Sequence, residues 1–266
     1  MNSPGQSSLG RSFSIQLSVI GALLLREVIT RYGRHGLGVL WLMFEPMWFT
    51  LGVAGLWYLT KLHTFSNIPI IAFAITGYSS VLMWRNTASR CSKAILPNLS
   101  LMYHRNVKVM DIFLSRIILE WVGATASIAT LTIICASIGV MRWPQDMMLV
   151  IGGWLLLAWF SLGLGFVVGV VSERSETFER TWHVITYLLF PLSGAVYMVH
   201  WIPTKAAQDA LLWLPMVHAV EMIRHGYFGN LVPTHENPAY LATFNLFLML
   251  IGLALVREAG RRVEPE

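Results

Sequence analysis

Residues 147–172 read MMLVIGGWLLLAWFSLGLGFVVGVVS and carry no charged side chain. A helix of this length can cross the hydrocarbon core of a bilayer, which takes about 20 residues. Five other stretches are similarly apolar, namely residues 37–58, 68–84, 117–140, 182–198 and 240–256. The pattern predicts an all-α membrane protein with six transmembrane helices.

The composition excludes an ordinary soluble protein. Apolar residues make up 55% of the chain and charged residues only 12%, whereas soluble domains are about 25% charged. The six apolar stretches leave too little contiguous polar sequence for a separate soluble domain, so residues 1–266 are predicted to form one membrane domain. The formal net charge of +5 requires no nucleic-acid partner.

The basic residues favour one side of the membrane. With six spans, all 19 lysines and arginines except Lys61, Arg142, Lys205 and Arg224 fall on the side of the two termini. The positive-inside rule therefore predicts that both termini are cytoplasmic. The chain then divides into a tail with an interfacial helix (1–36), spans one to five (37–198), an outer region (199–239), span six (240–256) and a cytoplasmic tail (257–266).

The segment before the first span has the pattern of an amphipathic helix. Arg26, Thr30 and Arg34 follow one another at four-residue spacing along one face. Another face would carry Phe13, Leu17, Ile20, Leu24 and Val28. Such a helix is expected to lie in the cytoplasmic interface of the membrane.

The outer region is too apolar for a simple loop. Residues 210–214 and 216–227 are separated by Pro215, and each piece is too short to cross. They are predicted to form two short re-entrant helices. One face of the second would carry His218, Glu221 and His225, with Arg224 adjacent, and is expected to line an outer gate. Because the spacing is not His-Glu-x-x-His and no third ligand is evident, no metal site is expected.

Two features allow alternative interpretations. Glu45 precedes Pro46 inside the first span, where it is either a functional ionisable group or a partner for backbone groups freed by a proline kink. The cytoplasmic connector 85–116 contains a short predicted helix with an apolar edge and a basic edge. That helix would lie on anionic lipid or bind a soluble partner, and the spacing alone favours lipid. Its edges are formed by Leu99, Met102, Tyr103, Arg105 and Lys108.

Two segments resemble a known family. The first runs through Leu24-Leu25-Arg26-Glu27, Arg31-Tyr32, Leu37-Gly38, Leu40-Trp41 and Glu45-Pro46. The second is Leu212-Trp213-Leu214-Pro215-Met216-Val217-His218-Ala219-Val220-Glu221, followed by Arg224. Both resemble signatures of the ABC-2-type permeases that export capsular polysaccharides. With the length and the six predicted spans, the resemblance covers nearly the whole chain.

The resemblance implies a homodimer that works with two copies of a separate cytoplasmic ATPase in the bacterial inner membrane. The chain has no Gly-Lys dipeptide and hence no Walker A phosphate loop. ATP and Mg would therefore be bound by the partner, and this chain is expected to have no cofactor and no catalytic residue. The implied cargo is a lipid-linked acidic polysaccharide, passed to a periplasmic co-polymerase-type adaptor and an outer-membrane polysaccharide exporter.

The resemblance also suggests roles for individual residues. Aromatic rings could stack on sugar faces and arginines could bind carboxylates or a lipid phosphate, although each aromatic could equally anchor a helix in the interface. The expected cargo path comprises Arg26, Arg31, Tyr32, Arg34, Trp41, Glu45, Trp48, Trp57, Tyr58 and Trp84. The expected ATPase-coupling surface comprises Glu27, Leu99, Met102, Tyr103, Arg105 and Lys108, which favours a protein partner for the connector helix.

Other functions remain compatible with these residues. The cargo could be O-antigen, teichoic acid or a small molecule. The chain could also be an intramembrane enzyme on lipid-linked sugars, with His218 and Glu221 as acid and base. A proton-coupled transporter that uses Glu45 and the outer histidines is a third possibility, against which the lack of visible internal repeats argues mildly.

Overall fold

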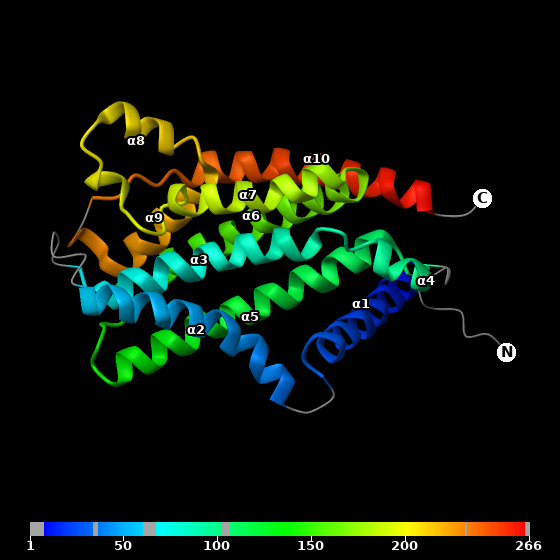
Figure 1. The fold of residues 1–266 in the computed structure, drawn as a ribbon, viewed down its shortest axis with the longest axis horizontal. Coiled ribbons are helices and arrows are strands. Elements are labelled where there is room, and N and C mark those ends of the chain that lie inside the picture. The colour runs from blue at the N-terminus through cyan, green and yellow to red at the C-terminus, as the bar shows by residue number, and fades with distance from the viewer. Residues whose placement is uncertain (1–7, 34–36, 61–67, 103–106, 232, 264–266) are drawn as a thin grey trace.

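The computed structural model describes residues 8–33, 37–60, 68–102, 107–231 and 233–263, and their regular structure is entirely helical. The long helices are α1 (Ser8–Tyr32), α2 (Leu37–Thr60), α3 (Ile70–Cys91), α5 (Val109–Ser137), α6 (Met147–Arg174), α7 (Glu176–Leu192) and α10 (Pro238–Val263) (Figure 1). The short ones are η1 (Leu96–Asn98), α4 (Leu99–Met102), η2 (Val199–Trp201), α8 (Lys205–Leu211), α9 (Pro215–Phe228) and η3 (Gly229–Leu231).

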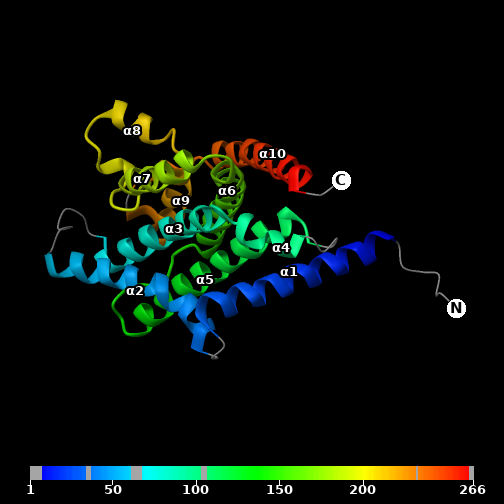
Figure 2. The same cartoon turned by 45° about the vertical axis from the view of Figure 1, so that its right-hand side comes forward.

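The long helices form an elongated bundle in which α6 is central. Helix α6 packs against α3, α9 and α10, while α5 packs against α3 and α1. Glycines on α6 allow this close packing, since a side chain at Gly163 would meet Leu248 of α10 and one at Gly153 would meet Ile223 of α9. The start of α1, the end of α10 and α4 lie at one end of the bundle, and α8 and α9 lie at the other (Figures 1 and 2).

Four helices in the described part of the chain are long and apolar enough to cross a membrane. They cover Ser12–Arg31, Val109–Ser137, Met147–Arg174 and Pro238–Arg262. Three of them, in α5, α6 and α10, match predicted spans. The fourth lies in α1, which the sequence pattern assigned to the membrane interface. The remaining predicted spans correspond to α2, α3 and α7, which are not among the four, so the count of six stays a prediction.

Several helix boundaries differ from those predicted. Helix α3 continues to Cys91, so residues 85–90 are helical and not part of the connector. Helix α7 begins at Glu176 because the Ser175 hydroxyl accepts a hydrogen bond from the Phe178 amide at 3.2 Å, and it ends at Leu192. Gly194, with φ of +82°, then turns the chain, so residues 193–198 do not continue the predicted span.

The short elements also differ in extent. The predicted half-helix at 210–214 is wrong, because α8 instead covers Lys205–Leu211. The second piece matches α9, in which Pro215 occupies the first helical position, where its missing N–H leaves no bond unmade. The connector helix is described only as α4 (Leu99–Met102), and Tyr103 and Arg105 lie outside the described residues.

Helix α1 contacts α5 through polar side chains, although Arg26 and Thr30 of the predicted polar face are exposed. Gln16 and Arg31 hydrogen-bond Asp111 and Glu120 of α5, and Leu23 is buried. Phe13 and Leu17 are exposed. Polar side chains therefore hold α1 against α5 and leave apolar ones on the outside.

Candidate functional site

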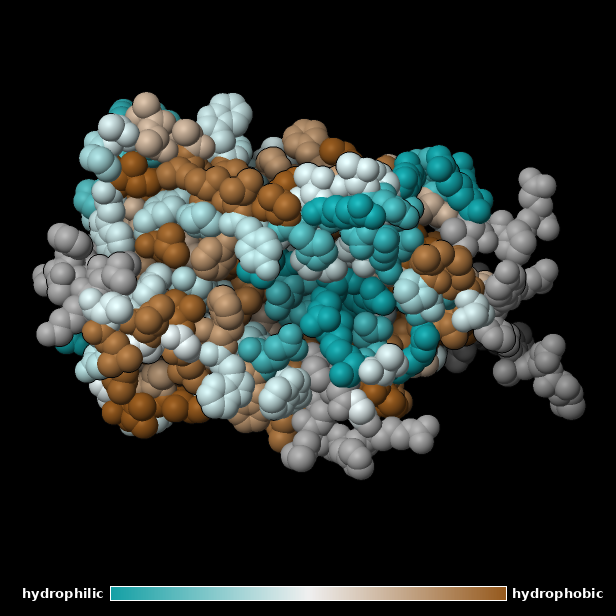
Figure 3. Space-filling view, viewed as in Figure 1, coloured by the Kyte–Doolittle hydropathy of each residue, from teal (hydrophilic) through white to brown (hydrophobic). Residues whose placement is uncertain are grey.

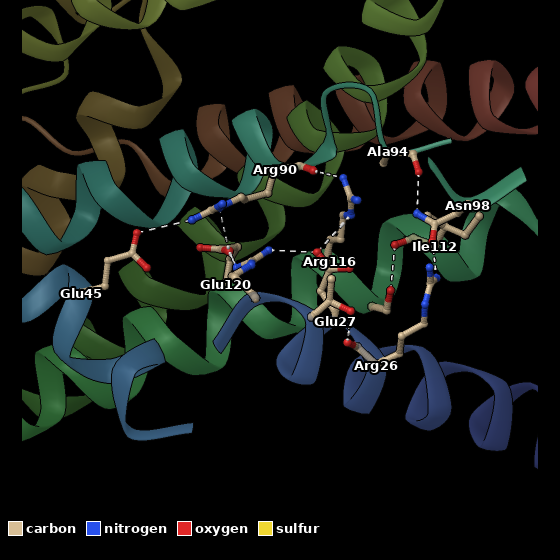
Figure 4. A network of polar contacts seen from close by, with 12 residues as sticks. Arg26, Glu27, Glu45, Arg90, Ala94, Asn98, Ile112, Arg116 and Glu120 are labelled. Atoms are coloured by element: carbon tan, nitrogen blue, oxygen red, sulfur yellow. Dashed lines mark hydrogen bonds and ion pairs between the residues drawn. The ribbon is translucent and has the colours of Figure 1, made fainter. Parts of the chain in front are cut away.

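A network of three arginines and three glutamates joins the helices near the end of the bundle that carries α4 (Figure 4). Arg31 pairs with Glu120 and, at 3.2 Å, with Glu27. Arg90 lies 3.5 Å from Glu120 and 3.4 Å from Glu45. The Arg116 guanidinium is 3.4 Å from Glu27 and donates a hydrogen bond to the Arg90 carbonyl at 2.7 Å. These contacts link α1, α2, α3 and α5.

The network explains how so many charges are accommodated in an apolar bundle. Burying an ionised side chain is costly unless an opposite charge and hydrogen bonds accompany it. The side chains of Arg31 and Glu120 are 14% and 9% exposed, and each has two partners of opposite sign. The six charges sum to zero. Arg31 and Glu45, both predicted in the cargo path, therefore have structural partners here.

A polar groove of about 310 Å³ opens between α3 and α7. The α3 wall carries Arg85, Asn86, Ser89 and Arg90, and the α7 wall carries His183, Thr186 and Tyr187. The polar side chains on this side of the bundle form a broad patch in the space-filling view (Figure 3). Polar side chains are costly to place in a membrane, which makes this groove a candidate site for a polar solute.

The groove is suited to an acidic sugar. No carboxylate is among the described residues that line it, and the Arg85 guanidinium carbon lies 5.2 Å from the centre of the Tyr187 ring. Arginine donors match carboxylates in geometry, and an aromatic ring can stack on the apolar face of a sugar. The groove thus combines a charge that attracts a polyanion with hydroxyl and amide groups that can hydrogen-bond a saccharide.

The predicted aromatic residues divide into two groups. Trp41, Trp48 and Tyr58 are exposed on α2 and could meet cargo, lipid or another subunit. Trp57 packs against Phe73 and Tyr78, with ring centres 6.0 and 5.3 Å apart, and Trp84 is fully buried. Trp57 and Trp84 therefore belong to the core.

The remaining predicted cargo residues either lie near the network or fall outside the described residues. Arg26 donates a hydrogen bond to the side-chain oxygen of Asn98, just before α4. Arg34 and the side chain of Tyr32 lie outside the described residues.

Of the predicted coupling residues, Leu99 and Met102 form the two ends of α4, and Glu27 belongs to the network. Lys108 is exposed and precedes the first turn of α5. Met102 and Lys108 share a hollow of about 270 Å³ with Arg257 and Arg261 of α10. This end of the bundle therefore presents a basic hollow next to α4.

The predicted outer-gate residues join α9 to the connectors around it by hydrogen bonds and an ion pair. Arg224 is fully buried and donates hydrogen bonds to the carbonyls of Gly194, Ala195 and Tyr197 at 2.5–2.7 Å. Its guanidinium carbon lies 3.8 Å from the centre of the Phe73 ring. Burial raises the pKa of Tyr197 to about 12, so this phenol stays protonated and donates to the Leu192 carbonyl.

His218 and Glu221, the acid and base of the enzyme hypothesis, are both hydrogen-bonded to backbone groups. Glu221 accepts from the amides of Val199 and His235 at 3.3 and 3.1 Å. His218 accepts from the Asn237 amide through Nδ1, so its Nε2 carries the proton and donates to the Leu212 carbonyl at 2.8 Å. Both side chains are buried. This arrangement favours a structural role for them over proton transfer to a substrate.

His225 completes the outer cluster. It pairs with Glu236 across the connector that leads to α10. Within the described ranges, no three His, Cys, Asp or Glu side chains are grouped so that they could hold a metal ion.

A second, larger hollow of about 540 Å³ lies between α5 and α6. Its walls are almost wholly apolar, and the indole nitrogen of Trp154 within it already donates to Thr125 at 2.9 Å. A sugar polymer would find few hydrogen-bond partners there. The groove between α3 and α7 is therefore the better candidate for a polar cargo.

A family model described as "ABC-2 type transporter" matches residues 18–228. The chain belongs to the ABC-2 transporter family. The resemblance inferred from the signature segments is thus confirmed.

Its relatives in this family share almost the full length. It is 44% identical over 261 residues to the capsule polysaccharide export inner-membrane protein CtrC of Neisseria meningitidis serogroup B, with 98% of each chain covered. It is 40% identical over 261 residues to the protein of the same description, BexB, of Haemophilus influenzae, also with 98% of each covered. The polysialic acid transport protein KpsM of Escherichia coli is 29% identical over 245 residues, covering 92% of this chain and 95% of KpsM.

For this ABC-2 permease, sequence reasoning missed most of the groove. Arg85, Asn86 and Ser89 were assigned to a connector, and His183 and Tyr187 were treated as ordinary span residues. A signal was present, because positions 85, 86, 89 and 90 share one helical face when the helix is extended past Trp84. The predicted span 68–84 ends where the first charged residue follows, whereas the helix itself continues to Cys91. The face was missed for this reason.

Proposed function

We propose that this chain is the membrane subunit of an ATP-driven exporter that carries lipid-linked capsular polysaccharide across the bacterial inner membrane. The observation that carries the proposal is the polar groove between α3 and α7, which is built into an apolar bundle and whose described lining is basic and contains no carboxylate. Membership of the ABC-2 family and full-length similarity to capsule export permeases support it. Arg85 and Tyr187 are the residues proposed to meet the acidic sugars.

The proposed assembly is a homodimer. In one chain the groove is open along one face of the bundle, and exposed aromatic side chains such as Trp41 and Trp48 lie on neighbouring α2. A second copy opposite this face would enclose the polar walls of both copies and exclude lipid from them. The space between the copies would then form the translocation path, which nucleotide-driven movement opens and closes.

The proposed topology has six spans and cytoplasmic termini. At about 1.5 Å per residue, the 24 residues of α2 and the 22 of α3 extend for about 36 and 33 Å, enough to cross a hydrocarbon core of about 30 Å. Helices α3 and α7 would add the polar wall, α1 would lie in the interface, and α8 and α9 would be re-entrant. The basic hollow beside α4 would then face the cytoplasm.

A separate pair of ATPase subunits would bind at this cytoplasmic end and supply ATP and Mg, because the chain itself has no phosphate loop. Met102, Lys108 and Arg257 are proposed to contact it. The polymer would pass to a periplasmic adaptor and an outer-membrane exporter on the far side.

The test combines genetics with a purified complex. Deletion of the gene should abolish surface polysaccharide and leave polymer inside the cell, and the wild-type chain should restore export. The chain should also co-purify with the ATPase encoded beside it, and lipid-linked capsular polysaccharide should stimulate ATP hydrolysis. Unchanged surface polysaccharide together with no complex would refute the proposal. Stimulation by lipid-linked O-antigen or teichoic acid instead would keep the exporter and change its cargo.

A further inference from the structure

The connector that leads from α3 to α4 is hydrogen-bonded to the last turn of α6, just before α7 begins. The Ser172 hydroxyl accepts a hydrogen bond from the Lys93 amide at 3.1 Å. One carboxylate oxygen of Glu173 accepts from the amides of Ile95 and Leu96 at 2.6 and 3.3 Å. Amides that begin a helical segment have no partner within it, so Glu173 satisfies groups that would otherwise be unpaired.

A side-chain ion pair reinforces this junction. Lys93 turns the chain with φ of +48°, and its ammonium lies 2.6 Å from the Glu179 carboxylate of α7. The hydrogen bond that the Lys93 ammonium donates to Glu179 raises the pKa of Lys93 above its ordinary value, so Lys93 remains charged at neutral pH. The connector is thus attached to the last turn of α6 by its backbone and to α7 by a side chain.

The attachment point and the groove share one side of α7. His183, Thr186 and Tyr187 follow Glu179 by four, seven and eight residues, which places all four on one helical face. Eight residues correspond to about 12 Å along a helix. A displacement applied at Glu179 therefore reaches the groove wall through two turns of continuous helix.

We propose that Lys93, Glu173 and Glu179 are positioning residues that join the α4 connector to the end of α6 and the start of α7, so that these segments move as one unit. Movement of α4 by the ATPase then shifts the α7 wall of the polar groove. This inference rests on the proposed function, because it assumes that the ATPase binds at α4.

The first experiment removes the backbone link at Glu173. Glu173→Ala should reduce the polysaccharide exported per ATP hydrolysed by about tenfold or more, the factor expected when charge-assisted hydrogen bonds are lost. Complex formation with the ATPase and basal ATP hydrolysis should stay unchanged. Glu173→Gln should restore most of the export, because the amide oxygen still accepts from the two backbone N–H groups. Glu176→Ala is the matched control, since Glu176 lies three residues further along, is exposed at the start of α7 and pairs with Arg180 of the same helix at 3.7 Å.

The second experiment locks the junction. Lys93→Cys and Glu179→Cys are introduced together and joined by a short bismaleimide. The native Cys91 and Cys135 are buried, and wild-type protein treated with the reagent reports any reaction there. If the connector and α7 move together, the cross-linked complex should export at a rate within about twofold of the uncross-linked double variant.

The outcomes separate this inference from the proposed function. Full export by Glu173→Ala, or export blocked by the cross-link, would overturn the inference and leave the exporter assignment intact. An equal loss of export in Glu173→Ala and Glu173→Gln would also overturn it. Such a result would mean that the charge of Glu173 matters and that its hydrogen bonds to the backbone do not. Failure of the wild-type chain to bind the ATPase would instead count against the proposed function.

Discussion

The pairing of Arg31 with Glu120 provides the sharpest test of how this bundle holds its charges. Arg31 comes from α1 and Glu120 from α5, and both side chains are largely buried. Each retains one other partner when the pair is broken, since Arg31 keeps Glu27 and Glu120 keeps Arg90. Arg31→Ala and Glu120→Ala should therefore each cost about 2 kcal/mol of unfolding free energy, less than the 3–5 kcal/mol for a buried charge left wholly unpaired.

The double variant shows whether the two losses share one cause. Two independent losses would sum to about 4 kcal/mol, whereas a shared interaction should bring the double variant to about 2–3 kcal/mol, a coupling of about 1–2 kcal/mol. The assay is reversible unfolding in mixed micelles, monitored by tryptophan fluorescence. The exposed pair Glu176–Arg180 is the control and should show almost no coupling.

Export measurements then test the predicted role of Arg31 in the cargo path. Arg31→Ala should lower export while assembly with the ATPase persists. If Arg31 acts by holding Glu120, the double variant should export at least as well as Arg31→Ala. The structural interpretation would be refuted if Arg31 and Glu120 were coupled no more strongly than the control pair and the double variant exported less than Arg31→Ala. Arg31 would then remain a cargo residue.

Three further predictions follow from the groove and the outer cluster. Arg85→Gln should lower export about tenfold without changing assembly or thermal stability, whereas Arg180→Gln should leave surface polysaccharide unchanged. Arg224→Met should cost about 3–5 kcal/mol, seen as a large fall in the unfolding midpoint, because three carbonyls lose a buried cationic donor. Gly77→Ala should cost about 1–3 kcal/mol, since its methyl group would meet the Ala195 carbonyl and the Arg224 guanidinium, while Gly55→Ala, which meets nothing, should be neutral or stabilising.

The sequence was informative where one property repeats along the chain. The apolar stretch 147–172 matches α6, and the short helix after Pro215 matches α9. Glu27 and Arg31, four residues apart on α1, form an ion pair at 3.2 Å. These features are local, because a helix and its next turn are fixed by residues only a few positions apart.

The candidate site was less predictable because its parts are distant in sequence. Arg31 and Glu120 are 89 residues apart, and Glu45 and Arg90 are 45 apart. Trp41 and Trp57 look equivalent in the sequence, yet one is exposed and the other packs against Phe73. Whether a side chain meets solvent, cargo or core depends on which helix lies beside it.

By itself, the sequence determined a helical membrane protein, because hydrophobic length acts on each segment separately. Only the tertiary structure decided that the cationic side chains in the first half of the chain serve different purposes. Arg31 and Arg116 are neutralised by carboxylates from other helices, whereas Arg85 faces a groove with no lining carboxylate. The reason is physical: a charge is neutralised or left available according to what lies within a few ångströms of it, and those neighbours are brought together only by the packing of the bundle.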